Sequence, residues 1–511
     1  MTSVPKSHRP KAAHAQRRAP STTPPAKSAR RSSKASAPSA VESSPRAAGP
    51  VHGDRASVRV YRQGLGDCIL IRVKRTSGND FKLLIDCGVV LGTPNAGDIM
   101  TRVVENLVKD TDQKVDAIAI THEHWDHVSG FTQAKDSFKK LKTDEVWVAW
   151  TEDKDDELAN TLRSELGKAA QALAASATAL RAAGDSETVQ MLADIALAPF
   201  GAAASASTSA ALDYVKSMGK VRICRPSDKP FEIGGTNARF YVLGPPHDSQ
   251  LIRKINPSTK NPETYGLVMN GEGALSFGVV AALASREEAA DDKAAPFHPR
   301  VTIPLGPKGR PVVGDSHSLD REARTAWEKI DDFFQKNYAR SEGDDWRRID
   351  GEWLGSATEL ALALQSYTNN TSLVLALELG DPGKGDILLF AADAQVGNWE
   401  SWQSWECPID GGKVTGPDLL KRTIFYKVGH HGSHNATLKE HGVDQMDALK
   451  AAIIPVDEKE ALKKHWGRMP LPDLIAALEK KVPGMVLRTD QKPSNPPDNL
   501  LISDDYFEIR L

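Results

Sequence analysis

The stretch that decides the fold is Val115-Asp-Ala-Ile-Ala-Ile120, followed at once by Thr121-His-Glu-His-Trp-Asp-His127. The short apolar run predicts a buried strand, and the polar run places three imidazoles and a carboxylate directly beyond the end of that strand. Three histidines and one aspartate at these offsets should arise by chance on the order of once per thousand chains. The segment is therefore the strongest candidate for a functional site in the sequence.

The spacing within this segment suits metal ions. On a loop that leaves a strand, His122 and His124 point the same way and can share one metal, whereas Asp126 and His127 lie one turn further on and can serve a second. The alternative interpretation is a polar, solvated strand-to-helix loop with no chemical role. Imidazole and carboxylate groups at this spacing favour a metal site.

Short apolar runs on both sides of the segment predict a sheet with covering helices. An amphipathic helix is predicted over residues 98–109, and no internal repeat is found. Strands are predicted at 58–61, 68–73, 82–86, 145–149, 221–224, 239–243, 372–378, 386–391, 424–428, 451–456 and 485–488. Strands mixed with helices, and a polar motif at the carboxyl end of a strand, indicate an α/β fold.

Two later segments can supply further ligands. The strand predicted at 386–391 delivers Asp393 just beyond its end, where a carboxylate can bridge two cations. The run Lys427-Val-Gly-His-His-Gly-Ser-His434 does the same with imidazoles, and its glycines allow close backbone approach. A lone pair of histidines is more often structural or exposed, but beside the first motif the pair favours ligation.

Charge and composition divide the chain. Residues 1–56 carry 11 Lys or Arg against Glu42 and Asp54, a net charge of +9, with eight prolines and no Leu, Ile, Phe, Tyr or Trp. We expect a disordered basic tail that contacts nucleic acid or an anionic surface, or that serves only as a solubilising linker. The remaining 455 residues have 54 basic and 65 acidic side chains, a net charge of −11. We expect them to form one folded domain, 57–511, interrupted by a helical insertion at 151–220 and a second insertion at 247–366.

Other features exclude several protein classes. Four cysteines without short paired spacing exclude a disulfide scaffold and a cysteine-based zinc ribbon. The longest apolar run, residues 275–284, is too short to cross a membrane, so no transmembrane segment is expected. No apolar segment follows the basic residues of the tail, which excludes a secretory signal and makes the cytoplasm the default location.

The motif His122-x-His124-x-Asp126-His127 resembles the signature of the metallo-β-lactamase-fold hydrolases. Further segments resemble the hydrolase domain attached to the competence DNA-uptake channel and its stand-alone relatives: Gln63-Gly-Leu-Gly-Asp67, Leu84-Ile-Asp-Cys-Gly88, Thr368-Asn-Asn-Thr-Ser-Leu-Val-Leu375 and Gly429-His-His-Gly-Ser433. The resemblance runs over 58–149, 221–246 and 367–510. It implies an αβ/βα sandwich, in which two mixed sheets lie face to face with helices outside.

The resemblance also implies a ligand set, carried over position by position. His122 and His124 would bind the first metal, and Asp126, His127 and a histidine of the segment 429–432 would bind the second, with Asp393 bridging. We expect His431 to be that ligand and His430 to be a neighbouring or acid–base group, so that Asp126 and His430 are the expected catalytic residues. Asp86 and Asp67 would support the metal loop, although a buried structural carboxylate describes Asp86 equally well.

The chain departs from the wider family at one position. Most binuclear members have a further histidine between the Asp-His pair and the bridging aspartate, and the matching segment here, 368–372, contains none. His247, His298 or His317 could substitute, although each is expected at the surface. The first metal would then be loosely held, with a position open for substrate.

The expected reaction is hydrolysis of a phosphodiester, either nucleic acid or a small molecule. Two divalent cations roughly 3.5–4 Å apart can share a hydroxide at neutral pH and stabilise charge on the attacked phosphoryl group. Zinc suits the imidazoles, and manganese suits the shared carboxylates. His430, His434 or Lys427 could stabilise or protonate the leaving oxygen, and Asn370 could contact substrate.

Two other function classes stay open. One is a hydrolase of a lactone, amide or thioester on the same centre, which an apolar pocket built by residues 151–220 would favour. The other is a non-catalytic binding module, against which the intact ligand set speaks. For a nucleic-acid substrate, the acidic domain argues against an extended binding face unless the tail supplies one. Trp125, Trp399, Trp402, Trp405 and Trp466 could stack on a base, but packing is the commoner role of tryptophan.

Overall fold

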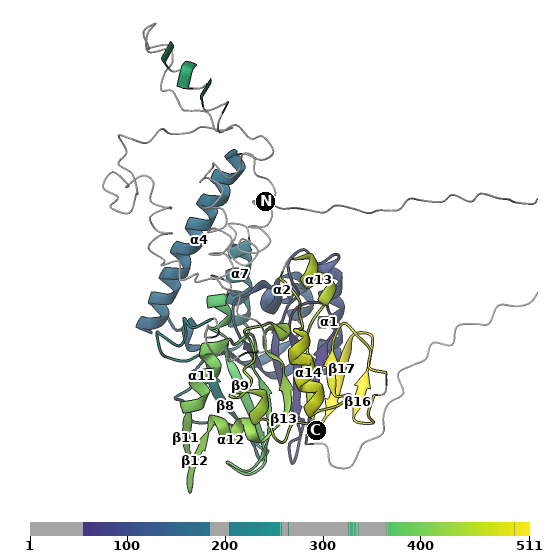
Figure 1. The fold of residues 1–511 in the computed structure, drawn as a ribbon. Helices are drawn as coiled ribbons and strands as arrows, with labels where there is room; N and C mark the ends of the chain where they lie inside the picture. The colour runs from purple at the N-terminus through teal and green to yellow at the C-terminus, as the bar shows by residue number, and fades with distance from the viewer. Residues whose placement is uncertain are drawn as a thin grey trace, which may run out of the picture. The chain divides into compact units, whose positions relative to one another are not determined.

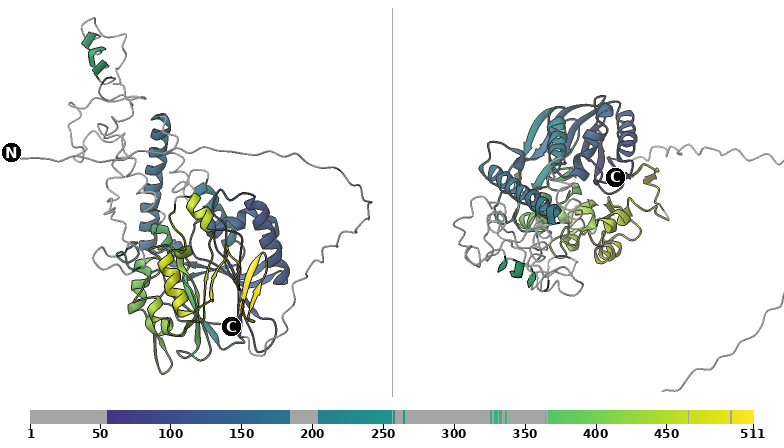
Figure 2. Two further views of the ribbon diagram at one scale, coloured as in Figure 1. Left: turned by 45° about the vertical axis from the view of Figure 1, so that its right-hand side comes forward. Right: turned by 90° about the horizontal axis from the view of Figure 1, so that it is seen from above.

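A computed structural model gives the arrangement of the chain (Figures 1 and 2). It describes residues 55–183, 204–255, 257, 264, 325, 326, 328–330, 332, 333, 336, 364, 366–464, 466–494 and 496–511. The expected tail up to residue 54 and most of the second expected insertion lie outside the described residues.

The first sheet contains most of the N-terminal half of the domain. Its strand order is β16-β17-β1-β2-β3-β4-β5-β6, antiparallel up to β3 and parallel from β3 to β6. The bounds are β1 Ala56–Tyr61, β2 Cys68–Val73, β3 Phe81–Cys87, β4 Lys114–Ile120, β5 Lys142–Ala149, β6 Lys220–Cys224, β16 Leu500–Ile502 and β17 Tyr506–Arg510. The last strand of the chain thus pairs with the first.

The second sheet has the order β15-β14-β13-β10-β9-β8-β7, antiparallel from β7 to β10 and parallel from β10 to β15. Its strands are β7 Phe231–Glu232, β8 Ala238–Gly244, β9 Val374–Leu379, β10 Asp386–Phe390, β13 Thr423–Lys427, β14 Ala451–Ile454 and β15 Val486–Arg488. A separate hairpin joins β11 Glu406–Ile409 and β12 Gly412–Thr415.

The two sheets pack face to face on one apolar core. Ile69, Leu83 and Ile85 of the first sheet share a buried cluster with Leu375 and Leu388 of the second. Each of these strands presents alternate residues to the core, which is why both sheets are richest in Val, Ile and Leu. Burial of this interface is the main stabilising contribution to the fold.

Helices cover the two outer faces. On the first sheet lie α1 Ala96–Asp110, α2 Trp125–Gln133, α3 Lys135–Phe138 and α7 Ala204–Lys216, and on the second lie α11 Val396–Ser404, α12 Gly416–Lys421, α13 Glu458–Lys463 and α14 Pro472–Lys481. Short 3₁₀ turns are η1 Trp150–Glu152, η9 Gly429–Gly432 and η10 Val443–Gln445. The expected αβ/βα sandwich of two mixed sheets is therefore confirmed (Figures 1 and 2).

The described part of the first expected insertion is helical. It holds α7 and the long helix α4 Glu157–Ala183, whose first turns pack on Trp150 through Ala159 and Leu162. Among the described helices, none combines the length and the apolar character needed to cross a membrane.

Candidate metal centre

The signature segment folds as the sequence predicts. Strand β4 ends at Ile120, His122 and His124 lie on the connecting loop, and α2 begins at Trp125, with Asp126 and His127 in its first turn. The His124 carbonyl accepts the backbone N–H of His127 at 3.0 Å, so the loop passes directly into the helix. All four side chains are buried. One short segment therefore delivers four donor groups to the same place.

Glycines let two other loops touch the backbone of this segment. Asp67 donates its N–H to the Asp126 carbonyl at 3.1 Å, and Gly88 donates its N–H to the Asp67 carbonyl at 2.9 Å. A Cβ on Gly88 would lie 2.4 Å from the Asp126 carbonyl carbon, and one on Gly66 would lie 2.6 Å from the Asp126 oxygen. Only glycine permits such close packing, so both loops fix the first turn of α2.

Asp86 holds the motif from behind. Its carboxylate accepts the backbone N–H of Thr121 at 2.8 Å and the Thr121 hydroxyl at 2.6 Å, and it lies 2.8 Å from His127 Nδ1. Because Nδ1 is engaged in this way, His127 Nε2 faces Asp393 at 3.3 Å. A carboxylate behind an imidazole is the usual way to orient a metal-binding histidine. Asp86 thus lies behind His127, and its role in supporting the metal loop stays a prediction.

Asp393 lies at the centre of the cluster. It follows β10, and its Oδ2 is within 4.0 Å of one nitrogen from each of four histidines: 4.0 Å from His122 Nε2, 3.3 Å from His127 Nε2, 4.0 Å from His430 Nε2 and 3.8 Å from His431 Nε2. A single buried carboxylate oxygen thus faces imidazoles from both sheets.

The two histidines after β13 both turn toward Asp393. His430 has φ 43° and His431 has φ 52°, left-handed conformations that are uncommon for residues other than glycine. His431 Nδ1 contacts the Pro455 carbonyl at 2.6 Å, which leaves Nε2 3.1 Å from Asp126 Oδ2. His431 therefore faces the Asp126 side of the cluster, and its role as a metal ligand stays a prediction.

Three further residues named from the sequence have their polar atoms engaged elsewhere. Lys427 Nζ lies 2.5 Å from Asp67 Oδ2 and 2.9 Å from the Ala392 carbonyl, and the side chain is 1% exposed. His434 contacts its neighbour Ser433 at 3.5 Å. The Asn370 amide donates to the carbonyls of residues 251 and 252, at 3.1 and 2.8 Å. The structure places none of the three side chains against the histidine cluster, apart from the 3.6 Å approach of Lys427 to Asp393.

Sequence reasoning missed Asn369, the neighbour of Asn370. Its Nδ2 lies 3.1 Å from His430 Nε2, and the residue is 2% exposed. The available signal was positional, because Asn369 belongs to the segment that matches the missing family histidine. His247 does not fill that gap, since its Nε2 pairs with Asp156 at 2.8 Å. His298 and His317 lie outside the described residues.

The tryptophans named for base stacking serve mainly as packing. Trp399 and Trp402 are fully buried, with ring centroids 4.2 Å apart, and Trp399 Nε1 donates to the Ala436 carbonyl. Trp405 Nε1 donates to the Pro226 carbonyl. Trp125 and Trp466 are half-buried. At least Trp399, Trp402 and Trp405 therefore have a packing role.

Burial and mutual charge govern protonation in the cluster. Burial lowers the pKa of His124 and of His430 to about 4, and burial together with the neighbouring histidines holds the pKa of His122 well below its usual value. Burial opposes protonation of His127 too, but the carboxylates of Asp393, Asp126 and Asp86 outweigh it and raise the pKa. Without a metal, the carboxylates thus hold a proton on His127.

The donor set fits divalent cations. Asp126, His127, Asp393 and His431 are buried, and each offers one ligand atom within 4.8 Å of the others. Asp67, Asp86 and His127 form a second such group, although Lys427 already pairs with Asp67. Buried carboxylates need compensating charge, and here four are buried (Asp67, Asp86, Asp126 and Asp393), of which Lys427 pairs with Asp67 and lies 3.6 Å from Asp393. Imidazole and carboxylate donors with surplus negative charge suit a divalent metal.

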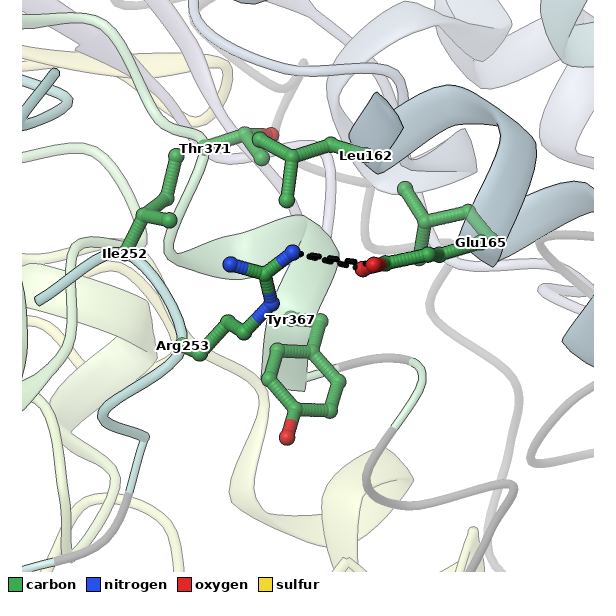
Figure 3. Close-up of a pocket in the computed structure, with 7 residues that line it drawn as sticks. Leu162, Glu165, Ile252, Arg253, Tyr367 and Thr371 are labelled. Carbon is green, nitrogen blue, oxygen red and sulfur yellow. Dashed lines mark hydrogen bonds and ion pairs between the residues drawn. The ribbon is translucent and has the colours of Figure 1, made fainter. Parts of the chain in front are cut away.

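A small cavity lies beside the segment that carries Asn369. It is lined by Leu162, Glu165, Leu166, Ile252, Arg253, Tyr367 and Thr371. Figure 3 shows the Arg253 guanidinium directed at Glu165, to which it is ion-paired at 2.8 Å. The wall of the cavity thus contains leucines of α4 and the ion pair between Arg253 and Glu165.

A model of the metallo-beta-lactamase superfamily matches residues 61–143, from the end of β1 through the signature segment into β5. The match supports the metallo-β-lactamase superfamily. Most members of that superfamily are hydrolases, so the match and the His/Asp cluster together suggest a metal-dependent hydrolase that binds divalent metal. Comparisons with curated proteins and with solved structures gave no match. No finding bears out the narrower resemblance to the competence-channel hydrolase domain, which stays a prediction.

Proposed function

We propose that this protein is a metal-dependent phosphodiesterase with two divalent cations in the cluster around Asp393. The observation that carries the proposal is the approach of four histidine nitrogens to Asp393 Oδ2, all within 4.0 Å. A carboxylate in that position can bridge two cations, with His122 and His124 on one side and Asp126, His127 and His431 on the other. Zinc suits the imidazoles, and manganese is the second choice.

The cations would supply Lewis acidity to a phosphoryl oxygen and lower the pKa of a water molecule. The chain's own part is to hold the donors in place. Asp86 orients His127, and the Pro455 carbonyl orients His431, each through Nδ1, so that Nε2 faces inward. Lys427 fixes Asp67 and lies 3.6 Å from Asp393, so it acts as a positioning residue rather than as a donor to the leaving oxygen.

A phosphodiester is the preferred substrate for two reasons. Its charge develops on oxygens that a dication pair stabilises well, and the segments described from the sequence resemble a hydrolase domain linked to DNA uptake. Nucleic acid and small phosphodiesters both remain within the proposal. The acidic domain favours the smaller substrate, unless the basic tail recruits the larger one.

One observation favours a carboxyl substrate instead. Leu162 and Leu166 of α4 line the cavity next to Ile252, so the first insertion does contribute apolar surface close to residues 367–371. A lactone or thioester with an acyl chain would use such a surface. The same metal centre would then polarise a carbonyl oxygen.

A substrate panel distinguishes these functions. Zinc- or manganese-loaded protein is offered bis(p-nitrophenyl) phosphate, p-nitrophenyl butyrate and an acyl lactone, with the Asp393→Asn variant as the matched control. The proposal predicts turnover of the phosphodiester that the variant lacks. Faster turnover of the lactone or the ester would favour the carboxyl alternative, and metal binding without any turnover would favour a binding module.

A further inference from the structure

The first cation site lacks a third nitrogen ligand in the sequence, and the structure brings two candidate groups to that place. His122 Nε2 and His124 Nδ1 are 3.0 Å apart, and His122 Nε2 is 4.0 Å from Asp393 Oδ2. His430 Nε2 lies at the same separation, 4.0 Å, from that oxygen. His430 is thus as close to the carboxylate as an accepted member of the signature.

Asn369 lies against His430 at this place. Its Nδ2 is 3.1 Å from His430 Nε2. The residue is 2% exposed, yet its Oδ1 accepts no hydrogen bond from the part of the chain that the structure describes. A buried amide oxygen without a donor is unfavourable, so its retention calls for a partner. A divalent cation is a partner that such an oxygen accepts.

The backbone of the 429–432 turn is strained at both histidines. His430 and His431 each have a left-handed conformation, with φ 43° and 52°. The His430 N–H donates to the Ala392 carbonyl at 3.0 Å, which ties this conformation to the residue before Asp393. Strain of this kind persists where surrounding contacts maintain it, most often at functional sites.

We propose that His430 and Asn369 complete the first cation site in place of the histidine that the chain lacks. His122, His124, His430 and Asn369 would then hold the first cation, with Asp393 shared. This assignment rests on the proposed binuclear centre. It replaces the acid–base role that the sequence favours for His430, and proton transfer to the leaving group falls to solvent.

The test is the number of metal ions that the protein binds. Metal-free full-length protein is equilibrated with Zn²⁺, separated from free metal and measured by elemental analysis, and a parallel titration with Co²⁺ follows the visible absorption. The wild type should bind two ions. His430→Gly, which accepts a positive φ without strain, should bind one and lose one step of the Co²⁺ titration. His434→Ala, a histidine outside the cluster, should still bind two.

A rescue variant and a second substitution keep the test decisive. Asn369→His in the His430→Gly background places an imidazole at the family position and should restore the second ion. If His430→Gly does not fold by circular dichroism, Asn369→Ala takes its place and should weaken the first site at least tenfold. Two ions bound with unchanged affinity in the variant would overturn this assignment alone. Fewer than two ions in the wild type would overturn the binuclear function as well.

Discussion

Asp393 is the residue on which the centre depends. Four histidine nitrogens from two sheets converge on one of its oxygens, so it is in contact with both proposed halves of the site. Changing it to asparagine removes a negative charge that the imidazoles stabilise, since burial alone would raise the pKa of Asp393 but His127, His431 and His430 hold that pKa well below its usual value.

Asp393→Asn should abolish activity while the protein stays folded. We expect a loss of turnover of roughly 100-fold or more, a lower metal content, and a lower melting temperature of the metal-free protein, because the pairing of Asp393 with the imidazoles is lost. Kinetics, elemental analysis and calorimetry check the three. Loss of the cooperative unfolding transition in the metal-free variant would mean that Asp393 is needed for the fold itself.

Substitution of Asp86 tests whether a residue that does not bind metal orients the metal-binding ring of His127. Asp86→Asn should weaken metal binding about 10- to 100-fold, because His127 loses the carboxylate that fixes its ring. Glu378→Gln is a matched control, since Glu378 is equally buried but pairs with Arg239, Arg422 and Tyr241 in the second sheet. It should lower stability and leave metal affinity unchanged. Equal effects of the two variants on affinity would contradict the orienting role.

At the scale of the element, the strand-loop-helix unit β4–α2 was predictable because its information is local. An apolar run, a polar motif and a helix start follow one another within residues 114–133. The packing of Gly66 and Gly88 on Asp126 was not predictable, since it depends on contacts between loops that are 38 or more residues away in sequence. The same limit hid Asn369, whose partner His430 lies 61 residues further along the chain, after β13.

Gly88→Ala should displace the first turn of α2. The added Cβ would meet the Asp126 backbone at 2.4 Å, and we expect a loss of stability of about 1–3 kcal/mol together with a lower metal content. Gly97→Ala is the control, because Gly97 lies in α1 with nothing within 4 Å of the added Cβ. It should be neutral or stabilise by about 0.5–1 kcal/mol. Denaturant unfolding and elemental analysis compare the stability and the metal content of the two variants. A wild-type metal content in Gly88→Ala would show that close packing at Gly88 is not needed to hold the first turn of α2 in place.

For the whole molecule, the sequence predicted the two-sheet sandwich and most of its strands better than it predicted which strands pair. Hydrophobic runs located most strands, but β7, β16, β17 and the β11–β12 hairpin were not anticipated, because they are short or half-exposed. The pairing of β17 with β1 joins opposite ends of the domain, and no local pattern encodes such a contact. Local sequence patterns could not predict which residues of the first insertion line the cavity either.

The basic tail offers a prediction at this scale. Within the described part of the chain, the first residue is Arg55, whose backbone N–H donates to the Leu511 carbonyl, and we expect deletion of residues 1–54 to leave the domain intact. Turnover of bis(p-nitrophenyl) phosphate should stay within twofold of the full chain. Binding to single-stranded DNA should weaken, and its dependence on salt should become shallower, because fewer counterions are released. Fluorescence anisotropy at several salt concentrations measures this, and unchanged DNA binding would show that the tail is not involved.

We infer that hydrolysis by this protein depends on metal held by the cluster around Asp393. The sharpest test is hydrolysis of bis(p-nitrophenyl) phosphate by the full-length protein before chelation, after complete removal of metal, and after Zn²⁺ or Mn²⁺ is restored. We expect turnover that disappears with the metal and returns with it. Turnover that persists in protein shown by elemental analysis to be free of metal would rule out this dependence.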